Sequence, residues 1–235
     1  MSTLVQTVQI LWNPVDAVPQ AVARRRWVWP LVLLMFAGGF ATVALTLRWD
    51  PASSVLADLA SSGKLQNTSE ADLTEAVTTA GRVQLIKGLA FALLGIPMLV
   101  LVGAATVKFV TWLLGRKALF AGIFSALCVA LSPLVVAKLL LALLTLWQLD
   151  VTPEKAQALM PSNLALVFKP HSHKLSTVLA TVDFFGLWSA ALLGLGLSEV
   201  MQMSRGRALL FALALYVAYA ALVVVGLPGM SGGHL

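Results

Sequence analysis

Five long apolar runs constrain this chain more than any other feature of its sequence. They cover about residues 27–47, 88–114, 118–147, 175–200 and 208–227. A helix needs roughly 20 apolar residues to cross the ~30 Å hydrocarbon core of a bilayer. Every run meets that length. The sequence therefore predicts an all-α, polytopic membrane protein with five transmembrane helices in one bundle.

Composition excludes the soluble classes of protein. Hydrophobic residues make up 59% of the 235 residues and charged residues 11%, whereas soluble domains carry about 25% charged residues. The net charge of +6 does not indicate nucleic-acid binding, because the bases lie at the ends of the apolar runs, where they meet lipid head groups. The single cysteine, Cys128, lies inside a run and excludes a disulfide framework.

The distribution of bases predicts the orientation. The outer segments, 48–87 and 148–174, each mix bases with acids. The opposite segments are short and strongly basic, which the positive-inside rule places in the cytoplasm. We therefore expect a cytoplasmic N-terminus and an outer C-terminal tail at 228–235. The bases expected to be cytoplasmic and to contact lipid head groups are Arg24, Arg25, Arg26, Arg116, Lys117, Arg205 and Arg207.

Short helices are predicted outside the spans. Within residues 1–26, apolar side chains recur at helical spacing and Asn13-Pro14 is typical of a helix start. We expect one or two amphipathic helices on the inner membrane surface, with a frayed tail as the alternative. Ser69 and Asp72 form a capping box that begins a helix leading into the second run. The third run is too long for the bilayer, so it must tilt, kink at Pro133 or project.

One block of the sequence resembles a known family. The residues from Asp183-Phe-Phe-Gly-Leu-Trp188 to Gly194-Leu-Gly-Leu-Ser198, followed by a basic turn and another apolar run, resemble the bacterial branch of the Yip1 family. The resemblance implies five membrane helices in the bacterial inner membrane, a cytoplasmic N-terminus and no catalytic residues. Eukaryotic relatives act with small GTPases in vesicle traffic. We do not expect that role here, because the segment before the first run is short.

Asp183 is the sharpest candidate residue, because an acid inside a span usually faces protein or water. Helical spacing places it on one face with small residues that allow close helix packing. The alternatives are a packing role, a proton or substrate relay, and an acid at the membrane interface. The small residues on this face are Gly186, Ala190, Gly194 and Ser198.

Three further charges fall inside the predicted spans. Lys138 lies at a depth similar to that of Asp183, so the two could neutralise each other. Lys108 and Glu199 form a second possible pair near the inner end. In both cases the alternative is that the lysine snorkels to the nearer interface.

Two functions fit these features. The leading hypothesis is a non-enzymatic accessory or assembly subunit that binds other integral membrane proteins, for example in a transport or efflux complex. The alternative is a small transporter or channel that uses Asp183 and Lys138. No catalytic or nucleotide-binding motif occurs and no cofactor is expected. His171 and His173 are too few ligands for a metal site on their own.

Overall fold

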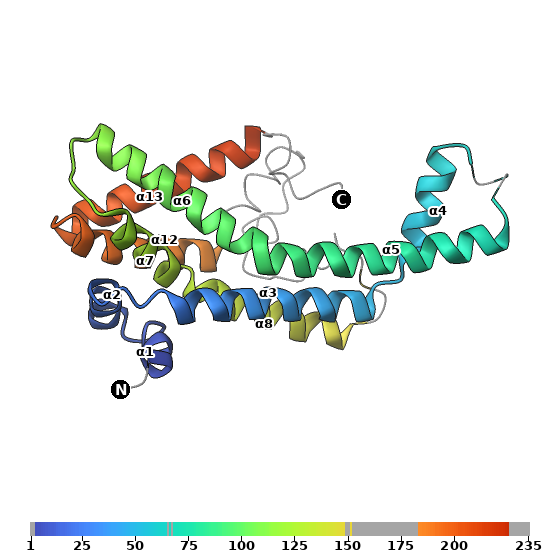
Figure 1. The fold of residues 1–235 in the computed structure, drawn as a ribbon, viewed down its shortest axis with the longest axis horizontal. Helices are drawn as coiled ribbons and strands as arrows, with labels where there is room; N and C mark the ends of the chain where they lie inside the picture. Colours follow the sequence, from blue (N-terminus) through green and yellow to red (C-terminus); the bar gives the residue numbers. More distant parts are fainter. Residues whose placement is uncertain (1–2, 65, 67, 149–150, 152–182, 226–235) are drawn as a thin grey trace.

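The computed structural model describes residues 3–64, 66, 68–148, 151 and 183–225 (Figure 1), and the regular elements within these ranges are helices. In chain order they are α1 (Thr3–Gln9), α2 (Pro14–Ala23), α3 (Val28–Arg48), α4 (Pro51–Ser61), α5 (Glu70–Ala90), the π-helical turn η2 (Phe91–Gly95), α6 (Ile96–Leu113), α7 (Phe120–Ala130), α8 (Ser132–Trp147), α12 (Phe184–Val200) and α13 (Arg205–Val225).

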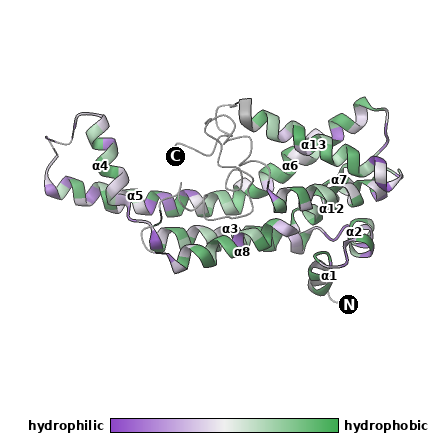
Figure 2. Ribbon diagram, turned by 180° about the vertical axis from the view of Figure 1, so that it is seen from behind, coloured by the Kyte–Doolittle hydropathy of each residue, from purple (hydrophilic) through white to green (hydrophobic). Residues whose placement is uncertain are grey.

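Four helical segments are long and apolar enough to cross a membrane: Val28–Arg48, Glu70–Leu113, Phe120–Trp147 and Arg205–Leu222. The fifth apolar helix, α12, has 17 residues. Apolar residues dominate these helices except in the first part of Glu70–Leu113, where hydrophilic residues are frequent (Figure 2). The chain is thus a multi-pass helical membrane protein. The part of the predicted fourth run before Asp183 lies outside the described residues.

One helix is far longer than a bilayer requires. The segments α5, η2 and α6 continue one another over 44 residues, which corresponds to about 66 Å. Ser69 is the N-cap of α5 and accepts a hydrogen bond from the Asp72 amide, which confirms the predicted helix start. The first part of α5 extends past the bundle with α4 beside it (Figure 1). We call α4 and this first part of α5 the arm.

The third run breaks into two helices, as its length and Pro133 predict. The break lies at Leu131, between α7 and α8, and Pro133 occupies the first turn of α8. Ser132 donates a hydrogen bond from its hydroxyl to the Val129 carbonyl at 2.7 Å. Proline is tolerated in a first turn because its missing N–H would have no partner there.

The largest core lies where α7 and α12 meet the N-terminal helices. Ile123, Val129 and Leu197 are fully buried there. Val18 of α2 is also fully buried in the same cluster, with Val22 3% exposed. The apolar face of α2 therefore packs on the ends of α7 and α12, whereas we had expected it to contact lipid. The reason is that small residues leave space there: Gly196 of α12 approaches Val22.

The other half of the molecule is built on α3. This helix packs against α8 on one side and against α5 and η2 on another. The amide of Val151 donates to the Arg48 carbonyl at 3.1 Å, which ties the chain after α8 to the end of α3. Because both helices run in the same direction, α3 and α8 end at the same level of the bundle.

Candidate functional site

A cleft lies between three helices in the apolar part of the molecule. Its volume is about 160 Å³ and it is lined by α3, by α5 to α6, and by α8. Helices α3 and α8 run in one direction and α5 to α6 in the other, so the lining residues form levels. The deep level comprises Gly38, Lys138 and Ile96; the middle level Ala41, Thr42, Leu141, Gly88, Phe91 and Ala92; the outer level Leu45 and Thr145.

The wall opposite Lys138 contains the π-helical turn. Phe91 begins η2 and is 56% exposed, while Ala92 is buried. At the cleft, α3 and α5 approach closely: a Cβ on Gly88 would overlap the Thr42 side chain. Single π-helical turns within α-helices occur frequently at functional sites. This turn widens the helix at the level of the cleft.

Lys138 contributes the one charged side chain in the lining of this cleft. It is exposed and also lines the cleft, and no hydrogen bond or ion pair joins it to another described residue. The Thr42 hydroxyl, which could have served as a partner, donates instead to the Gly38 carbonyl of its own helix at 3.1 Å. The site thus presents an unpartnered ammonium among apolar side chains.

Asp183 occupies a different position from the lysine. It is the N-cap of α12, and its carboxylate accepts a hydrogen bond from the Gly186 amide. No salt bridge to Lys138 is present in the described part of the chain. The side chain satisfies backbone donors that the first turn of a helix leaves without partners.

Tyr216 of α13 completes this cap. Its hydroxyl hydrogen-bonds to the backbone of Asp183. A Cβ on Gly186 would lie 2.5 Å from the same hydroxyl oxygen. Asp183, Gly186 and Tyr216 therefore form one unit that fixes the start of α12 against α13.

The small residues of α12 face two neighbours. A Cβ on Gly194 would lie 2.8 Å from the Leu209 Cα in α13, so these two backbones are almost in contact. Ala190 and Ser198 are 8% and 9% exposed. Gly196, which the sequence reasoning did not single out, lies against Ala126 of α7. Small residues permit such close approach between helices in lipid.

The second predicted pair does not form. The Lys108 ammonium donates to the Ala118 carbonyl at 2.6 Å, in the segment just before α7. The Glu199 carbonyl accepts from the Gln202 side chain. No salt bridge between Lys108 and Glu199 is found in the described ranges. Lys108 thus has a structural role at the junction of α6 and α7.

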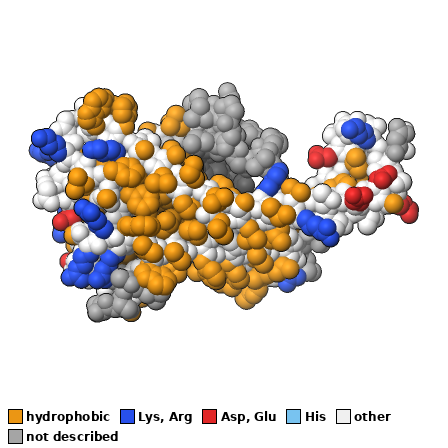
Figure 3. Space-filling view, viewed as in Figure 1, with side chains coloured by type: hydrophobic (Ala, Val, Ile, Leu, Met, Phe, Trp, Pro, Cys, Tyr) orange, Lys and Arg blue, Asp and Glu red, His pale blue; other side chains and the backbone are white. Residues whose placement is uncertain are grey.

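All seven bases of the predicted inner segments lie at one end of the bundle, because α3, α7 and α13 begin there and α6 and α12 end there. Blue side chains gather at that end in Figure 3, around a broad apolar middle. Gly115, with φ of +67°, allows the tight turn after α6, and the Arg116 amide donates back to the Thr111 carbonyl. This turn holds Arg116 and Lys117 at the bundle end.

The opposite end carries the arm, where a basic side chain lies among acidic ones (Figure 3). Acidic side chains cluster near the far end of the arm (Figure 3). A shallow groove of about 540 Å³ follows α5 there, lined by Asp72, Glu75, Ala76, Thr79, Ala80 and Val83. Neither α4 nor α5 has a buried residue. The two helices pack on each other, and the residues between them are only half-buried.

Metal binding has no support in the described ranges, where no group of three or more His, Cys, Asp and Glu residues could hold an ion. His171 and His173 lie outside those ranges. Cys128 is buried in α7.

The helices, the apolar middle and the basic end define a polytopic membrane protein. The Yip1 domain matches residues 8–227. Because this match covers nearly the whole chain, the chain belongs to the Yip1 family. No curated protein and no solved structure matches it.

Proposed function

We propose that this Yip1-family protein is a non-enzymatic accessory or assembly subunit that binds another integral membrane protein through the arm. The observation that carries the proposal is the arm itself, α4 and the first part of α5, which have no buried residue and lie beyond the end of the bundle. A helical pair of this kind has little core of its own, and a partner surface would supply the missing contacts. We place the protein in the bacterial inner membrane with its N-terminus in the cytoplasm and the arm outside.

Charge and shape indicate the chemistry of the partner. The groove on α5 contains Asp72 and Glu75 beside the apolar atoms of Ala76, Ala80 and Val83. Complementary potentials guide association and fix its register. The partner surface that fits is the outer loop of a membrane protein with basic residues flanking an apolar side chain. A subunit of a transport or efflux complex would supply such a loop.

Photo-crosslinking from the arm tests this proposal. A photoreactive amino acid at Thr79, inside the groove, should crosslink to one membrane protein in native membranes. Thr74 provides the matched control, because it is an equally exposed threonine of the same helix that does not line the groove. Glu75→Lys should abolish the Thr79 crosslink, whereas Thr74→Lys should leave it. Crosslinking to lipid alone from both positions would contradict an adaptor function.

Transport is the second candidate function, and the cleft beside Lys138 is the observation that favours it. A transporter needs a site that opens to each side of the membrane in turn. The Asp183 carboxylate bonds to the helix it caps, so only Lys138 is available for such a path in this arrangement. Reconstituted protein should then move an anion across vesicles, and Lys138→Met should stop that movement without affecting crosslinking from Thr79.

A further inference from the structure

We propose that the Lys138 cleft binds an oxyanion, a carboxylate or a phosphate group, inside the outer half of the membrane. The adaptor proposal does not use this cleft, so the two proposals stand independently. Three features support it: the depth of the ammonium, its surroundings, and the bases on the outer parts of the helices that line the cleft.

The first step is that Lys138 lies too deep to reach water by its own length. Trp147 ends α8 and is 90% exposed, and Trp49 follows the end of α3 at the same level. Tryptophans at helix ends mark the membrane interface. Lys138 precedes Trp147 by nine residues, or about 14 Å along the helix axis. The four-carbon stem of lysine covers less than half of that distance.

The second step is that no described residue forms a hydrogen bond or an ion pair with the ammonium. The other lining residues are the two threonines and eight apolar residues or glycines. An isolated ammonium in such surroundings is costly. Lys108, the other lysine inside a span, shows the usual solution, because it donates to the Ala118 carbonyl. Lys138 lacks such a contact among the described residues and faces a cavity instead.

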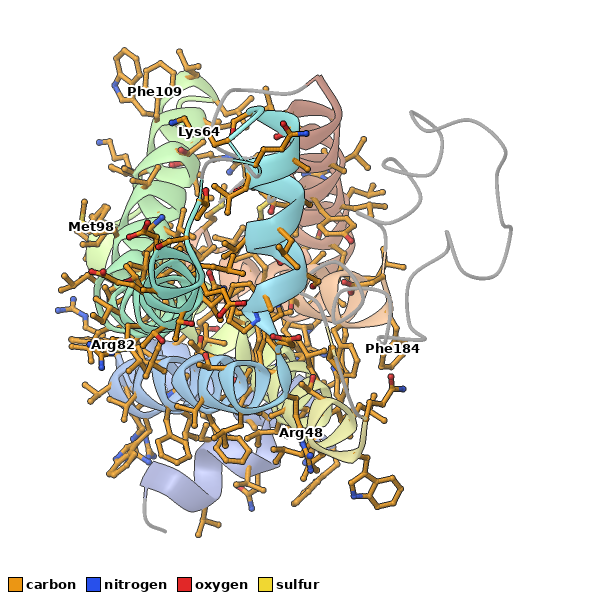
Figure 4. All side chains as sticks on the ribbon, turned by 90° about the vertical axis from the view of Figure 1, so that its right-hand side faces the viewer. Arg48, Lys64, Arg82, Met98, Phe109 and Phe184 are labelled. Carbon is orange, nitrogen blue, oxygen red and sulfur yellow. The ribbon has the colours of Figure 1, made fainter. Side chains whose placement is uncertain are left out.

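The third step is that basic residues lie on the outer parts of two of the helices that line the cleft. Arg48 ends α3, and Lys87 immediately precedes Gly88 of α5. Arg82 lies one turn or more before Lys87 in α5, toward the arm. Figure 4 labels Arg48 and Arg82 in a view from the arm end. The nearby acid Asp50 caps α4 by accepting from the Ala52 amide. Bases at this level attract anions from the water and from lipid head groups.

The size of the cleft limits the ligand. A cavity of about 150 Å³ holds a molecule the size of benzene, so 160 Å³ admits one carboxylate or phosphate with a short apolar segment. Phe91 and Leu141 line the middle level and would contact that segment. Two sources supply such a group: an anionic lipid that enters from the side, and a soluble anion that enters from the outer end.

Nanodiscs of defined composition separate the two sources. In the lipid experiment, the full chain is placed in phosphatidylcholine with a fraction of phosphatidylglycerol, and native mass spectrometry measures retained phosphatidylglycerol. In the soluble-anion experiment, inorganic phosphate is titrated against protein in phosphatidylcholine alone. We expect saturable binding in one of the two experiments. Lys138→Met should weaken it about tenfold or more, as expected when a charged hydrogen-bond donor is lost, and Lys138→Arg should restore most of it.

Matched variants distinguish the cleft from a general effect of charge or folding. Lys108→Met removes the other span lysine and should leave binding unchanged. Ala41→Phe fills the cleft and should prevent binding, while Val43→Phe, on an exposed face of the same helix, should not. Absence of binding in both experiments would overturn the proposal. Equal losses for Lys138→Met and Lys108→Met would also overturn it. Neither result would affect the Thr79 crosslink.

Discussion

Gly194 of α12 lies directly against Leu209 of α13: a Cβ on the glycine would come within 2.8 Å of the Leu209 Cα and 3.1 Å of its amide nitrogen. Backbone atoms cannot move aside as the end of a side chain can. The contact therefore fixes the distance between the last two helices. It also shows why a residue as poor a helix former as glycine stands in the middle of α12.

Gly194→Ala should destabilise the protein despite the higher helix propensity of alanine. The new methyl group meets backbone, and overpacking of this kind costs about 1–3 kcal/mol. Gly194→Leu should prevent assembly of α12 with α13. Gly206→Ala is the control, because nothing lies within 4 Å of that position. Thermal unfolding in detergent should give a lower midpoint for Gly194→Ala than for Gly206→Ala. If both alanine variants unfold at the wild-type temperature, the two helices are not packed as closely as described.

The cap of α12 predicts a graded series at Asp183. Asp183→Ala removes the acceptor for the Gly186 amide and should cost about 0.5–2 kcal/mol. Asp183→Asn keeps an oxygen acceptor and should cost less. Thermal unfolding of the two variants measures this order. If Asp183 instead relayed protons, a transport assay would find Asp183→Asn as inactive as Asp183→Ala.

The sequence predicts most of the helices because their causes are local. Apolar length identifies the spans, the Ser69 hydroxyl begins α5, and Pro133 marks the break between α7 and α8. The fold class follows from these signals. Amphipathic spacing likewise identifies α2. It cannot say whether the apolar face of a helix contacts lipid or protein, and Val18 proved to contact protein.

The candidate site could be predicted only in part. Lys138 is visible as a charge within an apolar run, but the cleft beside it depends on residues from three distant segments, such as Gly38, Gly88 and Thr145. Depth suggested Asp183 as its partner. The depth of a residue in the membrane does not say toward which neighbour its side chain points. The Asp183 carboxylate accepts from the Gly186 amide of its own helix instead. The π-helical turn at Phe91 has no signal in the sequence that we could identify.

Cysteine labelling should place the arm and the basic turn on opposite sides of the membrane. Lys64 and Lys117 are both exposed, and the native Cys128 is buried. In intact cells an impermeant maleimide should label Lys64→Cys and not Lys117→Cys, and both should react after permeabilisation. The physical reason is the positive-inside rule applied to Arg116 and Lys117. Labelling of Lys117→Cys alone would invert the proposed orientation.

The packing of α2 on the bundle predicts different effects for two valines of this short helix. Val18 is completely buried and Val15 is 44% exposed. Both Val→Ala changes raise helix propensity equally, so the difference between them reports burial. Val18→Ala should lower the free energy of unfolding by about 2 kcal/mol relative to Val15→Ala. Unfolding in a mild detergent measures this difference. If the two variants unfold alike, α2 is held by lipid, and its contacts with α7 and α12 contribute little to stability.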